Sequence, residues 1–191
     1  MPNQTRKASP AQVLSSREVY RGPVFWVTVD DVIEPGGIRA RRDIVRHPGS
    51  VVILAWDETR SGSCLLLERQ YRHAAQSYLW EVPAGRIDPG ESELAAAKRE
   101  LLEETGYTAS RWRRIFKYYA SPGFLDETMA IYLAVGLKSG RAQPEDDEFI
   151  RKRLVPFADA ARMVQNGTIR DGKTIAAILW LQNQNRRKPR H

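Results

Sequence analysis

Two short and almost uninterrupted apolar runs, residues 51–56 and 64–68, constrain the fold more than any other feature of this sequence. Each run has about the length of one strand, and neither alternates between apolar and polar residues. Strands of this kind are buried on both faces in the centre of a sheet. Because only the polar turn at residues 57–62 separates the runs, we expect two strands of a central sheet that is covered on both sides.

The rest of the chain supplies further strands and helices. Five segments read as strands because β-branched, aromatic or other apolar residues are concentrated in them: residues 24–33, 38–45, 79–82, 115–119 and 129–135. Three segments repeat apolar residues at helical spacing: residues 92–105, 157–164 and 175–179. This order predicts an α/β fold with a mixed central sheet flanked by helices. The first two strands, split by Glu34-Pro35-Gly36-Gly37, predict a small N-terminal antiparallel β arm.

Length and charge favour one globular domain with solvated ends. The chain has 191 residues, of which 42% are apolar, and this suits a single domain, placed at residues 48–185 after a β arm at residues 18–47. The net charge of +7 comes entirely from residues 1–17 and 186–191, which we expect to be a flexible N-terminal tail and a basic C-terminal tail. Nucleic-acid-binding proteins usually carry their positive charge on the folded body, so no nucleic-acid partner is expected.

The single cysteine and the apolar stretches bear on the location of the protein. Cys64 lies within an apolar run, so we expect a small buried side chain and not a nucleophile. The N-terminus lacks the apolar segment of a signal peptide, and no run approaches the length of a membrane span. We therefore expect a cytoplasmic protein without membrane contact.

Three glutamates near the end of the expected helix at residues 92–105 carry the clearest chemical signal. Glu100, Glu103 and Glu104 stand at positions i, i+3 and i+4, which places three carboxylates on one helix face. They also lie in the last turn, where the helix dipole disfavours negative charge, and each effect costs roughly a few tenths of a kcal/mol or more. A hard divalent cation such as Mg²⁺ would remove this cost, because it prefers carboxylate oxygens and keeps waters that a phosphate can displace.

Three glutamates alone would favour a solvated acidic face. The residues that flank them decide between that interpretation and a metal site. Arg99 precedes Glu100 by one residue and Glu103 by four, so it can hold a carboxylate in place. Gly85 and Gly90 bracket a tight loop between strand and helix, and glycine lets backbone carbonyls approach an ion. The flanks therefore favour the metal site.

Together these residues resemble the signature of the Nudix hydrolases. Five residues separate Gly85 from Glu91, seven more precede the segment 99–107, and every fixed position of the signature is filled. The resemblance implies a Nudix-type α/β/α sandwich and hydrolysis of a nucleoside diphosphate linked to another group. It implies Mg²⁺ as cofactor, with Mn²⁺ as a possible substitute. The implied metal ligands are the carboxylates and the carbonyl of four residues: Glu100 and Glu104 as principal ligands, Glu103 in support, and Ala84.

The resemblance also points to a general base outside the signature. In the family's sugar-diphosphate branch the base often comes from an acidic loop after the motif, and residues 145–149 match that loop. Glu148 is the expected base, and Glu145 and Asp146 are the alternatives. An ordinary solvated acidic loop is the competing interpretation.

Further features resemble the ADP-ribose pyrophosphatase branch of the family. Pro122 lies sixteen residues past Gly106, at the spacing typical of that branch. Similarity in the segments 41–49, 68–72 and 121–127 implies a set of substrate contacts: Arg41, Asp43, Arg72, Ser121, Gly123 and Glu127. Arg72 is expected to clamp a phosphate, because a guanidinium pairs bidentately with phosphate oxygens.

The branch implies a reaction and an assembly. The reaction is hydrolysis of the pyrophosphate bond of ADP-ribose to AMP and ribose 5-phosphate. In the branch the N-terminal strands are exchanged or packed across a two-fold axis, so a homodimer is expected. One alternative is the same chemistry on another nucleotide sugar, such as GDP-mannose or ADP-glucose. A non-catalytic nucleotide-sensing module is the other, and the three retained glutamates disfavour it.

Overall fold

The computed structural model describes residues 10–59, 63–140 and 151–187, which form two compact units. The smaller unit comprises the chain up to Pro48 together with Tyr119–Thr128. The larger unit comprises Gly49–Tyr118 together with the residues from Met129 onwards. The sequence expectation for residues 145–149 falls outside the described residues.

A seven-stranded mixed sheet forms the centre of the larger unit. Five strands follow the order β10-β5-β4-β9-β8, while β6 pairs with β5 and β7 pairs with β4. Their bounds are β4 Ser50–Asp57, β5 Cys64–Arg72, β6 Ser77–Glu81, β7 Ala84–Arg86, β8 Tyr107–Tyr119, β9 Thr128–Ser139 and β10 Arg151–Pro156, with a 3₁₀ turn η1 at His73–Ala75. Because β4 is parallel to β9 but antiparallel to β5 and β7, the sheet is mixed, as the sequence predicted.

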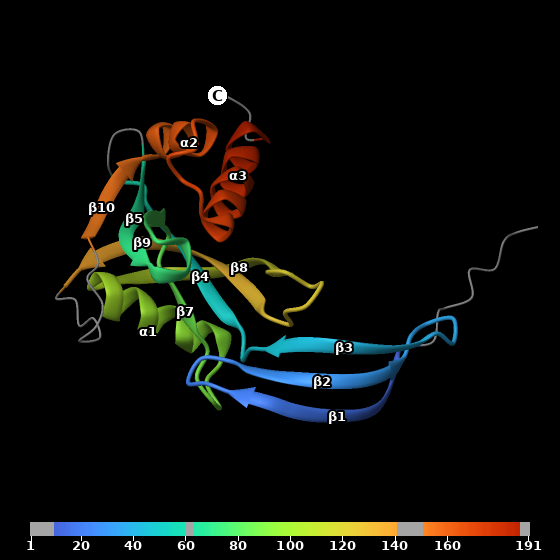
Figure 1. Cartoon of the computed structure of the whole chain (residues 1–191). Coiled ribbons are helices and arrows are strands. Elements are labelled where there is room, and N and C mark those ends of the chain that lie inside the picture. The colour runs from blue at the N-terminus through green and yellow to red at the C-terminus, as the bar shows by residue number, and fades with distance from the viewer. Residues whose placement is uncertain (1–9, 60–62, 141–150, 188–191) are drawn as a thin grey trace, which may run out of the picture. The chain divides into compact units, whose positions relative to one another are not determined.

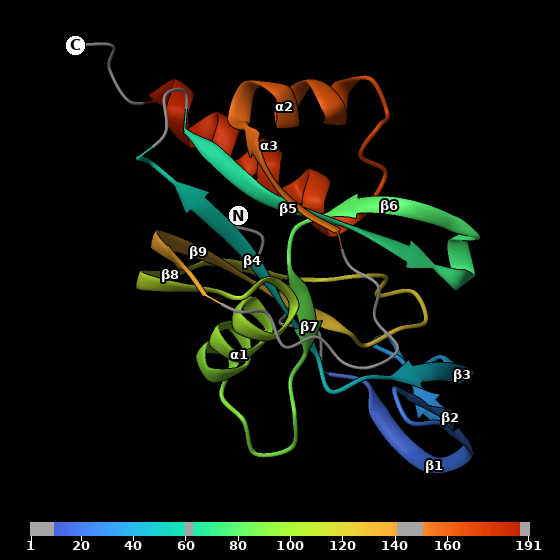
Figure 2. The ribbon, with the colours of Figure 1, turned by 90° about the vertical axis from the view of Figure 1, so that its left-hand side faces the viewer.

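Helices cover both faces of this sheet (Figures 1 and 2). Helix α1 (Glu93–Thr105) lies on one face, and α2 (Phe157–Gln165) and α3 (Gly172–Arg187) lie on the other. Alternate residues of β4 pack on opposite faces: Val51, Ile53 and Ala55 on the side of α1, and Val52, Leu54 and Trp56 on the side of α3. Burial on both faces explains why the apolar run does not alternate. The expected α/β/α sandwich is therefore confirmed.

The smaller unit is a three-stranded antiparallel sheet in the order β1-β2-β3. Its strands are β1 Gln12–Arg21, β2 Trp26–Ile33 and β3 Arg39–Arg46. Gly36 and Gly37 form the turn between β2 and β3 with φ angles of 97° and 85°, which glycine adopts without strain. The loop at residues 119–128 returns to β3, where the Val45 N–H donates to the Phe124 carbonyl at 2.8 Å. The predicted N-terminal β arm is thus present.

Parts of both expected tails belong to regular elements. Residues 12–17 were expected in a flexible tail but belong to β1. Pairing with β2 stabilises this polar segment, and the Ser16 hydroxyl donates to the Asp30 carboxylate at 2.6 Å. At the other end, α3 continues to Arg187, so Arg186 and Arg187 are helical and do not belong to a tail at residues 186–191.

The apolar segments lie where the composition predicted. Cys64 is free and buried at the start of β5. The three leucines that follow it are also buried, because helices cover both faces of the sheet: Leu65 and Leu67 pack on the side of α2 and α3, and Leu66 packs on the side of α1. Among the described residues, no helix is long and apolar enough to cross a membrane.

Candidate active site

Helix α1 places the motif glutamates, and both of its ends are fixed by caps. At its start the Ser92 hydroxyl accepts a hydrogen bond from the Ala95 N–H at 3.2 Å. At its end Gly106 adopts φ 70°, and its N–H donates to the Leu102 carbonyl at 2.7 Å. The predicted helix and both predicted ends are confirmed. The last two turns, which carry the carboxylates, therefore have a defined orientation.

Arg99 joins the helix to the loop that precedes it. Its guanidinium donates to the Glu91 carboxylate at 2.9 and 3.1 Å, and to the Arg86 carbonyl at 2.9 Å. It also donates to Glu100 at 2.8 Å and to Glu103 at 3.0 Å. The hydrogen bonds with Glu91 raise the pKa of Arg99 and lower the pKa of Glu91. The sequence predicted that Arg99 can hold one carboxylate in place. In the structure it binds three, and to one of them, that of Glu91, the sequence interpretation had assigned no role.

Gly85 lies directly against the carboxylate of Glu100. A Cβ atom at position 85 would stand 2.0 Å from the Cδ atom of Glu100, far inside any real contact, so any other residue would displace this carboxylate. The carboxylate of Glu104, which is almost completely buried, accepts from the Ala84 N–H at 3.2 Å. The last turns of α1 and the backbone at residues 84–85 are therefore in contact, as a shared metal site requires.

The chemistry of these groups fits a hard divalent cation. Carboxylate and carbonyl oxygens are the ligands that Mg²⁺ and Mn²⁺ prefer. Among the residues that the structure describes, no three acidic, histidine or cysteine side chains form a closed ligand group. Glu100 and Glu103 are instead held by Arg99. Glu100, Glu104 and the backbone at Ala84 could hold an ion, and Glu103 is the most exposed of the three glutamates.

Arg72, the expected phosphate clamp, lies at the end of β5 in the same unit. Its guanidinium donates from Nε and Nη2 to the two carboxylate oxygens of Glu81, both at 2.9 Å. The pKa of Arg72 is raised by these hydrogen bonds, and the charges of Glu104 and Glu68 contribute. Arg72 is therefore within electrostatic reach of the motif carboxylate Glu104. Its side chain is 39% exposed, which leaves donors accessible to a substrate.

Two other expected substrate contacts, Arg41 and Asp43, belong to the smaller unit. They stand two residues apart on β3, on the same face of the strand, and are 3.3 Å from each other. Both side chains are about two-thirds exposed, at 64% and 65%. An exposed pair of this kind contributes little to stability, so the two side chains are available for another contact.

The loop at residues 119–128 carries the remaining three expected contacts: Ser121, Gly123 and Glu127. Glu127 Oε1 stands 3.6 Å from the Nδ1 atom of His47. Asp126, to which the sequence interpretation assigned no contact, accepts from the His47 N–H at 2.8 Å and pairs with Arg46 at 3.1 Å. Asp126 thereby fastens the loop to the end of β3, which fixes the neighbouring Glu127.

Glu148 and its alternatives, Glu145 and Asp146, lie outside the described residues. The first described residue after them is Arg151, where β10 begins. Arg151 faces Arg69 of β5 in the antiparallel pairing of the two strands. The assignment of the base therefore stays a prediction.

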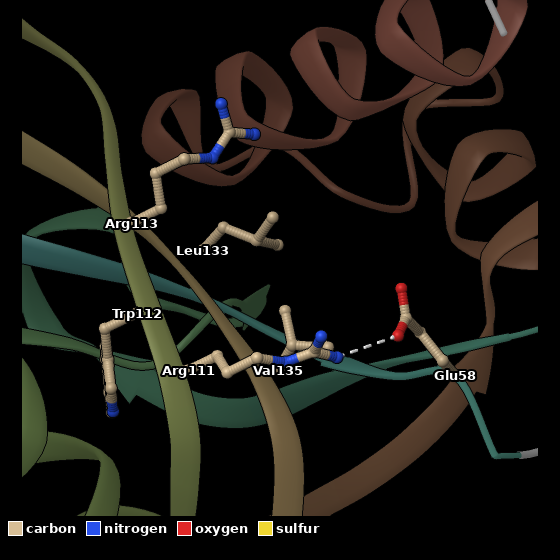
Figure 3. Close-up of a pocket in the computed structure, with 6 residues that line it drawn as sticks. All are labelled: Glu58, Arg111, Trp112, Arg113, Leu133 and Val135. Atoms are coloured by element: carbon tan, nitrogen blue, oxygen red, sulfur yellow. Dashed lines mark hydrogen bonds and ion pairs between the residues drawn. The ribbon is translucent and has the colours of Figure 1, made fainter.

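Two hollows have no motif carboxylate among the residues that line them. One, of about 250 Å³, is lined by residues of β8, β9 and the turn after β4: Glu58, Arg111, Trp112, Arg113, Leu133 and Val135 (Figure 3). In it Arg111 pairs with Glu58 at 3.4 Å. The other, of about 280 Å³, lies in the smaller unit and is lined by residues that include Pro122 and Phe124. Neither includes a motif carboxylate, so the candidate site rests on α1 and the backbone before it.

The sequence profile of the Nudix domain matches residues 45–178, which span most of this arrangement. The chain belongs to the Nudix family. The prediction from the motif is thus confirmed, and the chain is an enzyme of the Nudix pyrophosphohydrolase kind. The match begins at the end of β3 and ends within α3, so it includes the whole central sheet of this Nudix domain.

Several known proteins are similar to this Nudix chain over most of its length. The ADP-ribose pyrophosphatase of Bacillus subtilis is 35% identical over 178 residues, covering 92% of this chain and 95% of that protein. A methanol dehydrogenase activator of Bacillus methanolicus is 35% identical over 175 residues, covering 91% and 93%. A GDP-mannose pyrophosphatase of Salmonella paratyphi B is 35% identical over 157 residues, covering 78% and 81%. 

The crystal structure of an ADP compounds hydrolase is similar in fold. It superposes with a TM-score of 0.78 and covers 95% of this chain and all of that one. Only 24% of the residues are identical, so this likeness concerns the fold alone.

Proposed function

We propose that this Nudix enzyme hydrolyses the pyrophosphate bond of ADP-ribose to AMP and ribose 5-phosphate, with Mg²⁺ or Mn²⁺ as cofactor. The observation that carries the proposal is the packing of Glu100 and Glu104 against the backbone at residues 84–85, with Arg99 fixing the first of them. The ADP-ribose pyrophosphatase among the similar proteins supports the choice of substrate.

The candidate-site residues of the larger unit have distinct roles in this mechanism. Glu100, Glu104 and the Ala84 carbonyl would hold the ion, and Arg99 keeps Glu100 and Glu103 in place through its hydrogen bonds. When bound, the ion supplies a positive charge for the pyrophosphate oxygens and lowers the pKa of the attacking water. Arg72 donates hydrogen bonds to a phosphate.

Glu148 accepts the proton of the attacking water, and Glu145 and Asp146 are the alternatives for this role. A carboxylate suits it, because the water must lose its proton as its oxygen bonds to phosphorus. The smaller unit carries the other substrate contacts that the resemblance to the family implies: Arg41 and Asp43 for the nucleoside, together with Ser121, Gly123 and Glu127.

The arm is proposed to join two copies into a homodimer. Strand β1 is exposed along its whole length, and it carries apolar side chains that water would not favour, among them Val13 at 57%, Leu14 at 42% and Tyr20 at 52% exposed. Apolar surface gathered on one strand is typical of an interface. Sedimentation velocity tests this proposal: the wild type should sediment as a dimer, and Leu14→Asp should shift it toward the monomer. A monomeric wild type would contradict it.

The substrate is tested by measuring phosphate-ester release from ADP-ribose, with Mg²⁺ and with a chelator. GDP-mannose, ADP-glucose and a nucleoside triphosphate serve as comparisons. Metal-dependent preference for ADP-ribose is expected. Preference for GDP-mannose would favour the second candidate, which the similarity to the GDP-mannose pyrophosphatase supports. No hydrolysis of any compound would favour a sensing module.

A further inference from the structure

A row of four side chains with alternating charge runs from the start of α3 to the end of β5. Asp171 precedes α3, and its carboxylate stands 3.0 Å from the Nζ atom of Lys173 in the first turn. Lys173 in turn donates to the carboxylate of Glu81, at the end of β6. Glu81 accepts both hydrogen bonds from Arg72 at 2.9 Å. Lys173 is 92 residues from Glu81 in the sequence, so only the folded state forms this row.

The two middle side chains of this row, Glu81 and Lys173, are buried, so their charges depend on pairing with their neighbours. The side chain of Glu81 is 1% exposed and that of Lys173 is 10% exposed. A buried carboxylate is stable only when it is paired and hydrogen-bonded, and a buried ammonium has the same requirement. Burial alone would raise the pKa of Glu81, but hydrogen bonding to Arg72 and the charge of Lys173 outweigh it and lower the pKa. Glu81 therefore stays ionised and remains a fixed partner for Arg72.

The same turn of α3 also holds the backbone that leads to the metal site. The hydroxyl of Thr174, which is fully buried, accepts from the Val82 N–H at 2.9 Å and donates to Asp171 at 2.6 Å. Val82 stands two residues before Ala84. Residues 81 and 82 are thus both fastened to the first turn of α3, one by charge and the other by a neutral hydrogen bond.

We propose that Lys173 is a positioning residue for the hydrolysis: through Glu81 it holds the guanidinium of Arg72 in the orientation that contacts the substrate pyrophosphate. The inference rests on the proposed function, because it takes Arg72 as a substrate contact. The bidentate pair occupies one edge of the guanidinium. The donors on its other side remain for phosphate oxygens. Without Lys173, Glu81 loses one of its two cationic partners and its carboxylate can turn, which carries Arg72 away from the substrate.

A double-mutant cycle separates this role from a purely structural one. Lys173→Met should raise KM about tenfold, the size of one charge-assisted hydrogen bond, and change kcat less than about threefold. In the Arg72→Lys background, which keeps a positive charge but loses the planar fork, Lys173→Met should add less than about twofold. Lys117→Met is the matched control, because it also removes an ion pair, with Glu93 at 3.0 Å, at the opposite end of α1 from Glu100 and Glu104. It should leave KM unchanged.

Binding of inorganic pyrophosphate, measured by titration calorimetry with Mg²⁺ present, gives a second readout that does not depend on the identity of the nucleotide sugar. Lys173→Met should weaken pyrophosphate binding about tenfold in the wild type and hardly at all in the Arg72→Lys background. If the wild type does not hydrolyse ADP-ribose, the proposed substrate is refuted. The binding cycle with pyrophosphate would still decide the role of Lys173. If Lys173→Met fails to fold by circular dichroism, Glu81→Gln replaces it in the cycle. Equal effects of either variant in both backgrounds, on KM and on pyrophosphate binding, would overturn the proposal.

Discussion

Replacing Gly85 with alanine tests the contact on which the candidate metal site depends. The new Cβ atom would stand 2.0 Å from the Cδ atom of Glu100, and 2.1 and 2.3 Å from its two carboxylate oxygens. An ordinary carbon contact begins near 3.4 Å. The carboxylate must therefore retreat by roughly 1.4 Å, the difference between these distances. A misplacement of about 1 Å at a catalytic group lowers rates by about a hundredfold, so we expect a loss of that order in kcat/KM.

The stability change should be much smaller than the activity change. Glu100 is a flexible side chain at the edge of the site, so rotation relieves the clash, and a cost of about 1–2 kcal/mol is typical of such overpacking. Hydrolysis of ADP-ribose should be measured against Mg²⁺ concentration, because a displaced ligand raises the metal concentration needed for half-maximal rate. Thermal unfolding followed by circular dichroism reports the stability of the same preparations.

Gly172→Ala is the matched control for Gly85→Ala. Gly172 begins α3, has no positive φ angle, and a Cβ atom there would meet nothing within 4 Å. Its kcat/KM should equal that of the wild type. If Gly85→Ala kept kcat/KM within about threefold of the wild type at all Mg²⁺ concentrations, the placement of Glu100 against residue 85 would have no part in catalysis, and the reasoning would be refuted.

Three further predictions concern single carboxylates. Glu104→Gln should lower the rate of hydrolysis by about a hundredfold or more, because the substitution removes a metal ligand. The protein should remain folded by circular dichroism, because the glutamine oxygen can still accept a hydrogen bond from the Ala84 N–H. A near-normal rate would exclude the metal role of Glu104. Glu148→Gln should lower kcat more than it raises KM if Glu148 is the base, whereas a larger loss in Glu145→Gln would move that role to Glu145. The pKa of Glu81 is lowered in the folded state from an ordinary value of 4.5, so its pairing stabilises the fold above pH 4.5 and is lost as pH falls through the folded pKa. Urea unfolding of Glu81→Gln should accordingly depend less on pH in this acidic range than that of the wild type, and parallel pH profiles would contradict the assignment.

Local sequence patterns predicted the elements whose stability is decided locally or by uniform burial. The two strands β4 and β5 are apolar on both faces, and α1 carries its own start and stop signals in Ser92 and Gly106. Strand β1 gave no such signal, because all ten of its residues are exposed and only pairing with β2 holds it extended. Strand β7 is three residues long and contains Gly85, so its pairing with β4 cannot be read from composition.

The residues of the candidate site also divide into those that local sequence patterns predicted and those that only the folded structure brings together. The motif glutamates and Arg99 are close in sequence, and helical geometry alone brings them together. The packing of α3 on the sheet brings Glu81 and Lys173 together. Because they are far apart in the sequence, this ion pair could not be predicted from either residue. Glu91 was a fixed position of the motif without an assigned role. The structure gives it one, because its two carboxylate oxygens accept hydrogen bonds from Arg99 at 2.9 and 3.1 Å.

The crowding of negative charge at the end of α1 links stability to function. One guanidinium, that of Arg99, stands within 4 Å of four carboxylates: Asp88 at 3.7 Å, Glu91 at 2.9 Å, Glu100 at 2.8 Å and Glu103 at 3.0 Å. The last turn of α1 contains no basic residue, and it also carries Glu104. Lys152 donates to the Thr105 carbonyl at the same end of α1, but Arg99 is shared among four carboxylates, and negative charge near this end of a helix dipole is unfavourable. This crowding favours binding of a divalent cation, in keeping with the proposed function, and a side chain at residue 85 would push the Glu100 carboxylate away from the Ala84 carbonyl that is proposed to share the ion.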